Sequence, residues 1–166
     1  DIIMMMPPYH GALFKGNADQ IYEQFDEISK VGTPIMIQDA PLSGIELTVQ
    51  LLTKMINEIE YLTCFKIESA QAASKIRALI KNCSERLDAP FDGEESITLY
   101  ADLEAGISGS MSSALLPEKI APVIDHFWNN EKDKAEEVYN GILPLINFEN
   151  RQCGFRATKT VMKEGG

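Results

Sequence analysis

The chain alternates short, continuous apolar runs with segments whose apolar residues recur every three or four positions. Apolar runs of this kind are typical of strands buried on both faces of a parallel sheet, and they occupy residues 2–6, 34–37 and 61–68. Amphipathic helices are predicted after each run, capped by Asn17, beginning at Thr48 and capped by Ser69. One strand and one helix therefore recur about every 30 residues, which predicts an α/β fold built from βα units.

The apolar stripes define which side of each helix faces the core. The predicted inward residues are Ile21, Tyr22, Phe25 and Ile28, then Leu51, Leu52, Met55 and Ile59, then Ala72, Ala73, Ile76, Leu79 and Ile80. Gly32 ends the first of these helices.

The pattern weakens after the third helix and then changes. Residues 87–91 are a short fourth strand candidate, 97–103 a helix, and 105–111 a fifth strand candidate rich in Gly and Ser. From Pro117 onward helices follow one another without a strand, over 117–128, 132–146 and 156–163, and Pro144 is expected to kink or end the second of these. We therefore divide the chain into a βα part, 1–115, and a helical part, 116–166.

About five parallel strands fit either a small doubly wound sheet or the second part of an eight-stranded barrel. Polar residues gather where the predicted strands end, and in both folds ligands bind at that carboxyl edge. The chain enters its first apolar run directly after Asp1. We expect a preceding segment that belongs to the same fold.

Composition excludes several classes of partner and site. The chain has 15 basic and 25 acidic residues and a net charge of -10, so nucleic acid and anionic membranes would repel it. No apolar run approaches the roughly 20 residues of a membrane helix. Cys64, Cys83 and Cys153 are odd in number and widely spaced, which indicates a reducing, cytoplasmic setting and argues against a disulfide framework or a zinc site.

Lys66 is the residue most informative about chemistry. It shares a strand face with Cys64 and Glu68. Burial of an ammonium group favours the neutral amine, which can attack a carbonyl and form a Schiff base. The alternative is that Lys66 extends to solvent at the strand end or pairs with Glu68.

Other strand-end residues have both a functional and a structural interpretation. Gln38 and Asp39 could hold polar groups of a substrate, or Asp39 could close a turn. Tyr9 and His10 could donate a proton and contact a carboxylate, or simply pack in a loop.

Two further polar segments carry weaker signals. Glu94 and Glu95 are interpreted as the solvated, acidic start of a helix. The segment Gly106-Ile-Ser-Gly-Ser110 suggests a ligand loop but matches no phosphate-binding motif.

The ordered strand ends resemble those of the dihydrodipicolinate synthase and N-acetylneuraminate lyase family. The matching segments are Pro7-Pro-Tyr-His10, Pro34-Ile-Met-Ile-Gln-Asp-Ala-Pro41, Phe65-Lys-Ile-Glu68 and Phe91-Asp-Gly-Glu94. The resemblance implies a (β/α)8 barrel, present here from about its fourth strand, with a C-terminal helical extension. It also implies a class I lyase in which Lys66 forms a Schiff base with a 2-keto acid, without metal or cofactor, in a homotetramer.

The departures from the family pattern bear on the substrate. Gln38 stands where the family commonly has a proton-relaying tyrosine, and an amide cannot act as that acid or base. The segment Leu42-Ser-Gly44 replaces the arginine of dihydrodipicolinate synthases, which bind pyruvate and aspartate semialdehyde. The variant motifs look more like the branch that dehydrates 2-keto-3-deoxy sugar acids such as 2-keto-3-deoxyarabonate, and an aldolase remains an alternative.

The resemblance assigns roles to six residues. Lys66 and Tyr9 are the predicted catalytic residues, and Glu68 is a further candidate proton carrier. The predicted substrate-binding residues are Gln38, Glu68, Gly93 and Ser108.

A competing hypothesis is a non-catalytic ligand-binding α/β module. A phospho-receiver, for example, also places Asp and Lys at strand ends. It requires an acidic cluster after its first strand, where this chain has Pro7-Pro-Tyr-His10.

Overall fold

Four parallel strands form the central sheet of the computed structural model, which describes residues 1–10, 14–83, 85–88 and 90–165. The strands are β1 (Ile3–Met5), β4 (Ile35–Asp39), β5 (Leu62–Ile67) and β6 (Phe91–Asp92), hydrogen-bonded in the order β1-β4-β5-β6. Every neighbouring pair is parallel. The three apolar runs of the sequence are therefore confirmed as adjacent parallel strands.

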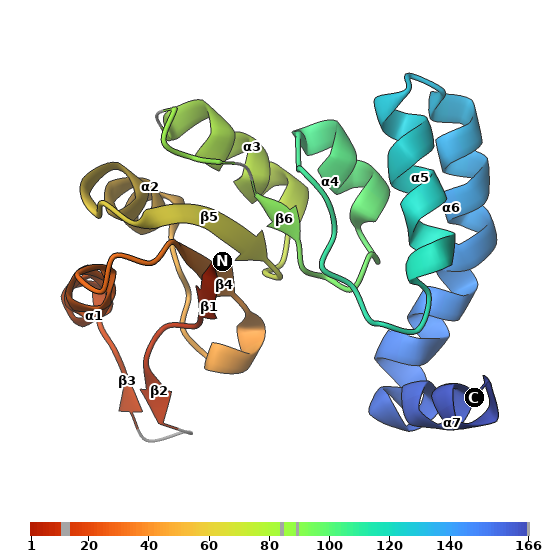
Figure 1. Ribbon diagram of the computed structural model, residues 1–166, viewed down its shortest axis with the longest axis horizontal. Coiled ribbons are helices and arrows are strands. Elements are labelled where there is room, and N and C mark those ends of the chain that lie inside the picture. The colour runs from red at the N-terminus through yellow and green to blue at the C-terminus, as the bar shows by residue number, and fades with distance from the viewer. Residues whose placement is uncertain (11–13, 84, 89, 166) are drawn as a thin grey trace.

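Helices follow one another along one side of this sheet (Figure 1). They are α1 (Ala18–Ser29), α2 (Val49–Glu58), α3 (Ala72–Asn82) and α4 (Leu99–Ala105). Their apolar stripes bury Phe25, Leu52, Ile76 and Leu103 in one core cluster with strand residues such as Ile37, Phe65 and Ile67. The alternation of strand and helix thus produces two layers that share one core.

Local capping confirms two of the predicted helix starts and corrects the third. Asn17 and Gln20 form a reciprocal capping box at α1, and the Thr48 hydroxyl accepts the amide of Leu51 at α2. The helix α3 begins later than predicted, because Gln71, in a left-handed conformation, is its N-cap in place of Ser69. The predicted inward position of Ile80 is also wrong, since this residue is 42% exposed.

The last part of the sheet is shorter than expected. The fourth strand covers only Phe91–Asp92, later than the predicted 87–91. The predicted fifth strand over 105–111 is reduced to one parallel bridge between Asp92 and Ser110, because Ala105 still belongs to α4. Position 89 lies outside the described residues.

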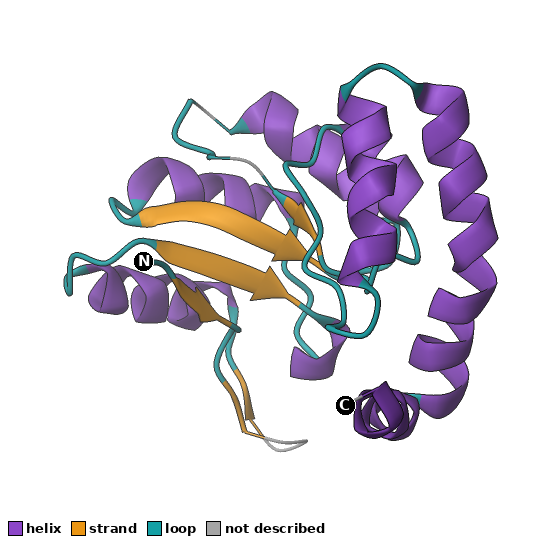
Figure 2. Cartoon of the chain, turned by 45° about the vertical axis from the view of Figure 1, so that its right-hand side comes forward, coloured by secondary structure: helices purple, strands orange, loops and turns teal. Residues whose placement is uncertain are grey.

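The C-terminal segment is helical, as predicted. It comprises α5 (Pro117–Trp128), α6 (Lys132–Asn147), a π-helix (Phe148–Cys153) and α7 (Phe155–Gly165). Pro144 does not end α6, which continues to Asn147 before the backbone widens into the π-helix. Figure 2 shows α5 and α6 side by side, with α7 turned across the lower end of α6.

A small antiparallel hairpin was not expected from the sequence. It joins β2 (Tyr9–His10) to β3 (Phe14–Lys15), with Tyr9 opposite Lys15. It projects from the sheet after β1 (Figure 1). Among the described residues, none of the helices combines the length and apolar character that crossing a membrane requires.

Candidate functional site

The two faces of β4 and β5 have different chemistry. Ile35 and Ile37 on β4, with Phe65 and Ile67 on β5, belong to the core cluster beneath the helices. Side chains alternate along a strand, so Gln38 and Lys66 are directed to the opposite face. These two residues are register partners in adjacent strands, close to where both strands end.

Lys66, Glu68 and Gln38 form a connected polar cluster on that face. The Lys66 Nζ lies 2.7 Å from Glu68 Oε1, and the Gln38 amide donates to the same oxygen at 2.6 Å. The Lys66 and Glu68 side chains are only 10% and 18% exposed. The predicted pairing of Lys66 with Glu68 is therefore present, but inside the structure rather than at a frayed strand end.

Gly93 forms one wall of this cluster. It follows β6, and its amide donates to Ile67 O at 2.9 Å. A Cβ at this position would lie 2.5 Å from Glu68 Cγ and 2.8 Å from Lys66 Cγ. Only a residue without a side chain allows Lys66 and Glu68 to occupy these positions. This close packing explains why glycine is required at position 93.

Glu95 also belongs to the site, and the sequence interpretation of this residue was wrong. The helix α4 begins only at Leu99, so neither Glu94 nor Glu95 is its first turn. Burial raises the pKa of Glu95, the Lys66 ammonium opposes that shift, and Glu68 and Glu149 reinforce it. Within the described residues its Oε2 is buried and has no hydrogen-bond partner. The site thus contains a partly buried carboxyl group whose pKa is raised above its ordinary value.

The C-terminal segment reaches the same turn. Arg151 in the π-helix pairs with Glu94. Glu149, which is buried, accepts hydrogen bonds from the hydroxyls of Ser113 and Thr158. The residues after α6 therefore help to enclose the turn that carries Glu95.

Two predicted site residues are not brought to this cluster by any described contact. Tyr9 lies in β2 of the hairpin, and its side chain is outside the part that the structure describes. Ser108 is exposed, and its amide donates to Pro90 O, before β6 begins. Ser110, two residues later, is the one that bridges Asp92. The roles of Tyr9 and Ser108 stay predictions.

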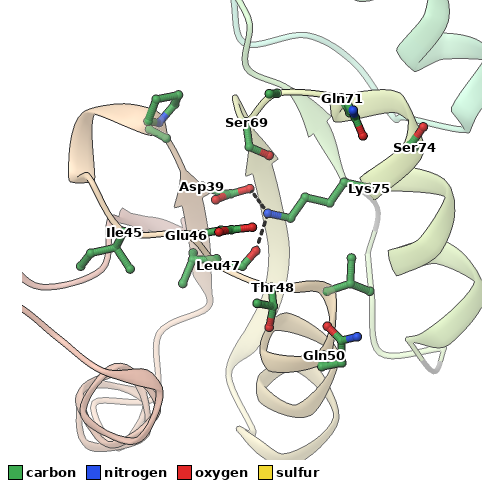
Figure 3. Close-up of a pocket in the computed structure, with 14 residues that line it drawn as sticks. Asp39, Ile45, Glu46, Leu47, Thr48, Gln50, Ser69, Gln71, Ser74 and Lys75 are labelled. Atoms are coloured by element: carbon green, nitrogen blue, oxygen red, sulfur yellow. Dashed lines mark hydrogen bonds and ion pairs between the residues drawn. The ribbon is translucent and has the colours of Figure 1, made fainter.

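Asp39 is directed away from the Lys66 cluster. Its carboxylate pairs with Lys75 Nζ at 2.6 Å, and Lys75 also donates to Leu47 O (Figure 3). This pair lines a separate cavity of about 650 Å³ between the starts of α2 and α3. Asp39 therefore links the sheet to α3, which neither of the two sequence interpretations anticipated.

Two buried carboxyl groups lie on the helix side of β6. Asp92 and Asp102 are both 0% exposed. The pKa of Asp102 is raised to about 6, mainly by burial and also by nearby Asp92, while the Thr98 hydroxyl opposes the shift. Burial also raises the pKa of Asp92, against the hydrogen bonds that it accepts.

The cysteines and acidic residues do not form a metal site in the described structure. Across residues 1–10, 14–83, 85–88 and 90–165, His, Cys, Asp and Glu side chains do not gather in groups of three that could hold an ion. Burial raises the pKa of Cys64 to about 12, so this neighbour of Lys66 is a neutral thiol. The described chemistry of the site is thus that of an amine, two carboxyl groups and an amide.

Solved structures share this fold at low sequence identity. Dihydrodipicolinate synthase from Rhodopseudomonas palustris superposes with a TM-score of 0.84 at 23% identity, over 98% of this chain and 56% of that one. The synthase from Aquifex aeolicus gives 0.83 at 20% identity, over 95% and 53%. The architecture is therefore that of the C-terminal part of a (β/α)8 barrel, which decides between the two folds left open by the sequence.

Curated relatives agree with this placement. An L-2-keto-3-deoxyarabonate dehydratase from Azospirillum brasilense is 45% identical over 166 residues, covering 99% of this chain and 54% of that protein. A 4-hydroxy-tetrahydrodipicolinate synthase from Listeria monocytogenes is 27% identical over 154 residues. The chain spans about half the length of the curated relatives that it matches.

A family profile covers the whole chain. The Dihydrodipicolinate synthetase family matches residues 1–166, which include the strand ends that carry Lys66, Glu68 and Gly93. The fold and the strand-end residues both agree with this match. The chain belongs to the Dihydrodipicolinate synthetase family.

Proposed function

We propose that this chain forms the lysine-bearing part of a Schiff-base lyase that dehydrates a 2-keto-3-deoxy sugar acid. The observation that carries the proposal is the enclosed cluster in which Lys66 contacts Glu68 and Glu68 accepts the Gln38 amide. A buried lysine beside a proton acceptor is the arrangement that a nucleophilic amine requires. The 45% identical relative named as a 2-keto-3-deoxyarabonate dehydratase supports the substrate class.

The chemistry begins with proton transfer away from the lysine. Glu68, 2.7 Å from Lys66 Nζ, accepts the proton that the ammonium must lose before it attacks C2 of the keto acid. Loss of water from the resulting carbinolamine gives a protonated imine, which withdraws electrons and acidifies the C3 proton. The imine is the covalent intermediate, and no separate cofactor is assigned to this step.

Elimination completes the reaction. A base removes the C3 proton, the electron pair forms an enamine, and the enamine expels the C4 hydroxyl, which leaves as water after it receives a proton. Glu95 is suited to these transfers, because burial raises its pKa and its Oε2 is unengaged within the described residues. Hydrolysis of the imine then returns Lys66 to its amine form. Tyr9 remains a second candidate for the proton transfers.

Dihydrodipicolinate synthesis is the alternative within the same family, and aldol cleavage is a second. Gln38 contributes an amide that is engaged with Glu68, so it offers no acid or base at that strand end. The turn after β4, Pro41–Ser43 and Gly44, supplies no arginine for a second carboxylate. These residues favour dehydration over synthesis, whereas aldol cleavage would use the same imine and break the C3–C4 bond.

The test is intact-mass spectrometry of the full-length protein after incubation with pyruvate and borohydride. We expect a reduced adduct that Lys66→Ala and Lys66→Arg both lose, since arginine keeps the positive charge but forms no such imine. Lys30→Ala, at an exposed lysine paired with Glu27, is the matched control and should keep the adduct. Absence of an adduct with pyruvate and with every 2-keto-3-deoxy acid would favour the non-catalytic module.

Substrate and reaction type are then separated by product mass. Dehydration of a 2-keto-3-deoxy acid releases one water and keeps the carbon chain, whereas aldol cleavage yields pyruvate and an aldehyde. Consumption of aspartate semialdehyde together with pyruvate would instead identify the synthase.

The setting that we propose is a cytoplasmic homo-oligomer. Cys64, Cys83 and Cys153, all within the described residues, form no disulfide, which is consistent with a reducing compartment. Four apolar side chains on α7 and in the preceding π-helix are exposed, namely Phe148, Phe155, Val161 and Met162. Apolar side chains that are exposed together are typical of a contact surface, and we assign this one to a second copy of the protein.

A further inference from the structure

The turn 93–96, which connects β6 to the segment before α4, has an unfavourable backbone. Glu95 and Ser96 have φ values of 55° and 68°, consecutive left-handed conformations in residues that carry a Cβ. Such conformations persist only where the surrounding structure holds them, and they gather at functional sites. The same turn places Gly93 against Lys66 and brings Glu95 to the site.

The Asp92 carboxylate is the group that holds this turn. Its Oδ1 accepts the amide of Glu94 at 3.0 Å, and its Oδ2 accepts the Ser110 hydroxyl at 2.6 Å. Because Asp92 is 0% exposed, water does not compete with these donors for its carboxylate.

Ser110 ties the turn to the next segment of the chain. Its hydroxyl lies 2.9 Å from that of Ser96, a residue that is itself 0% exposed. The backbone amide of Met111 donates to Asp92 O at 2.9 Å, next to the parallel bridge between Asp92 and Ser110. The Asp92 side chain therefore contacts the turn at Glu94 directly and at Ser96 through the Ser110 hydroxyl.

We infer that Asp92 is a positioning residue that acts through Glu95: its carboxylate fixes the turn 93–96 so that the Glu95 carboxyl faces Lys66 and Glu68. The inference rests on the proposed function, in which Glu95 transfers a proton. Asp92 itself is on the helix side of the sheet, where it cannot touch a substrate bound beside Lys66. Its contribution must therefore pass through the backbone of the turn.

A second buried carboxyl group, that of Asp102, lies near Asp92 on the helix side of β6. Asp102 Oδ2 accepts the Thr98 hydroxyl at 2.6 Å, and its Oδ1 has no hydrogen-bond partner among the described residues. Asp102 makes none of the contacts to the turn 93–96 that Asp92 makes, so it provides a matched control.

The experiment is a double-mutant cycle in the full-length protein, with kcat and KM measured on a 2-keto-3-deoxy acid. Asp92→Asn should lower kcat about ten-fold or more, change KM about two-fold at most, and keep the borohydride-trapped adduct. In a Glu95→Gln background the same substitution should change kcat less than about two-fold, because the group that it positions is already inactive. Asp102→Asn should leave kcat within about two-fold of the parent, since the side chain of Asp102 bonds to Thr98 and makes none of the contacts to the turn 93–96 that Asp92 makes.

The outcomes separate the inference from the function on which it rests. An equal loss of kcat in both backgrounds would show that Asp92 acts on general structure, and unchanged kcat in Asp92→Asn would show that it does not act at all; either result overturns the inference. If the parent protein gives neither an adduct nor turnover, the proposed function itself fails. If circular dichroism shows that Asp92→Asn does not fold, Ser110→Ala is used instead, because it removes a single donor to Asp92. Its effect on kcat is then compared in the parent and in the Glu95→Gln background, with the same two outcomes.

Discussion

At the scale of single residues, the site depends on contacts that a sequence pattern does not contain. Lys66 lies on β5 and Glu68 directly follows that strand, and their ion pair is available only because Gly93, from another strand end, leaves room for both side chains. Gln38 then orients Glu68 from the neighbouring strand. Each residue is constrained by another that is distant in sequence.

Gly93→Ala tests this constraint. The new methyl group would lie within 3 Å of Lys66 and Glu68 atoms, so one of these side chains must move. We expect kcat/KM to fall at least about ten-fold, with a free energy of unfolding lowered by about 1–3 kcal/mol. Gly109→Ala, which would bring a methyl group to 3.3 Å from the edge of the Phe91 ring, is the comparison outside the Lys66 cluster. Equal activity of the two variants would contradict the role assigned to Gly93.

Asp102 predicts a pH dependence of stability. Its pKa is about 6 in the folded protein and near 3.8 when unfolded, so between these values the folded state binds more protons. Stability from this group is fully present below about pH 3.8 and is lost as the pH rises through about 6, by up to about 3 kcal/mol.

Asp102→Asn removes that titration with little change in side-chain size. We expect the variant to exceed the parent in free energy of unfolding at pH 8 and to lose this advantage near pH 4, as measured by urea denaturation. Parallel stability curves for the two proteins across this pH range would refute the assignment.

At the scale of elements, the helices are positioned by caps as well as by apolar stripes. Asn17 accepts the Gln20 amide, and the Gln20 side chain accepts the Asn17 amide, each at 3.0 Å. Arg86 donates to the carbonyls of Ile59 and Glu60 where α2 ends, at 2.8 and 2.7 Å. These contacts satisfy backbone groups that a helix end otherwise leaves without partners.

Asn17→Ala should destabilise α1 locally. Loss of an N-cap typically costs about 1 kcal/mol. Amide hydrogen exchange should therefore become about five-fold faster in the first turn of α1 and remain unchanged in α3, whose N-cap is Gln71. Faster exchange throughout the sheet would indicate instead that Asn17 supports the whole fold.

The sequence analysis missed or misplaced the short elements. The hairpin β2–β3 and the strand β6 have two residues per strand, too few for a periodic pattern to be recognised. The start of α3 was placed at Ser69 by residue type, whereas backbone geometry at Gln71 decides it. The long strands and helices, by contrast, were found because several buried residues in each repeat the same spacing.

At the scale of the whole molecule, the sheet presents an apolar side to the helices and a polar cluster on its other side. Lys66 lies on the polar side, at the carboxyl edge of the sheet, where it pairs with Glu68. Asp39 lies on the helix side, where it pairs with Lys75 of α3. The C-terminal helices add Glu149 and Arg151 to the same edge. A single site therefore draws on both predicted parts of the chain, 1–115 and 116–166, whose division as domains stays a prediction.

The exposed apolar side chains of α7 make a prediction about assembly. Phe155 is 84% exposed, so its substitution removes little intramolecular packing. Phe155→Lys should shift the full-length protein to a smaller species in sedimentation velocity, because a charge would be buried in the contact between copies. Lys159→Ala, at an exposed polar position of α7, is the control. An unchanged sedimentation coefficient in Phe155→Lys would exclude this face as the contact.

The sequence by itself determined the α/β class, the three long parallel strands and the placement of Lys66 and Glu68 on one strand face, because strand and helix periodicities are local properties of the chain. It also indicated the family, through the order of strand-end motifs. Only the tertiary structure decided that Gly93 packs against Lys66, that Glu95 is a partly buried member of the site and that Asp92 is hydrogen-bonded to the turn carrying it. Those facts depend on which segments lie side by side, and desolvation and hydrogen bonding between distant residues arise only after the chain has folded.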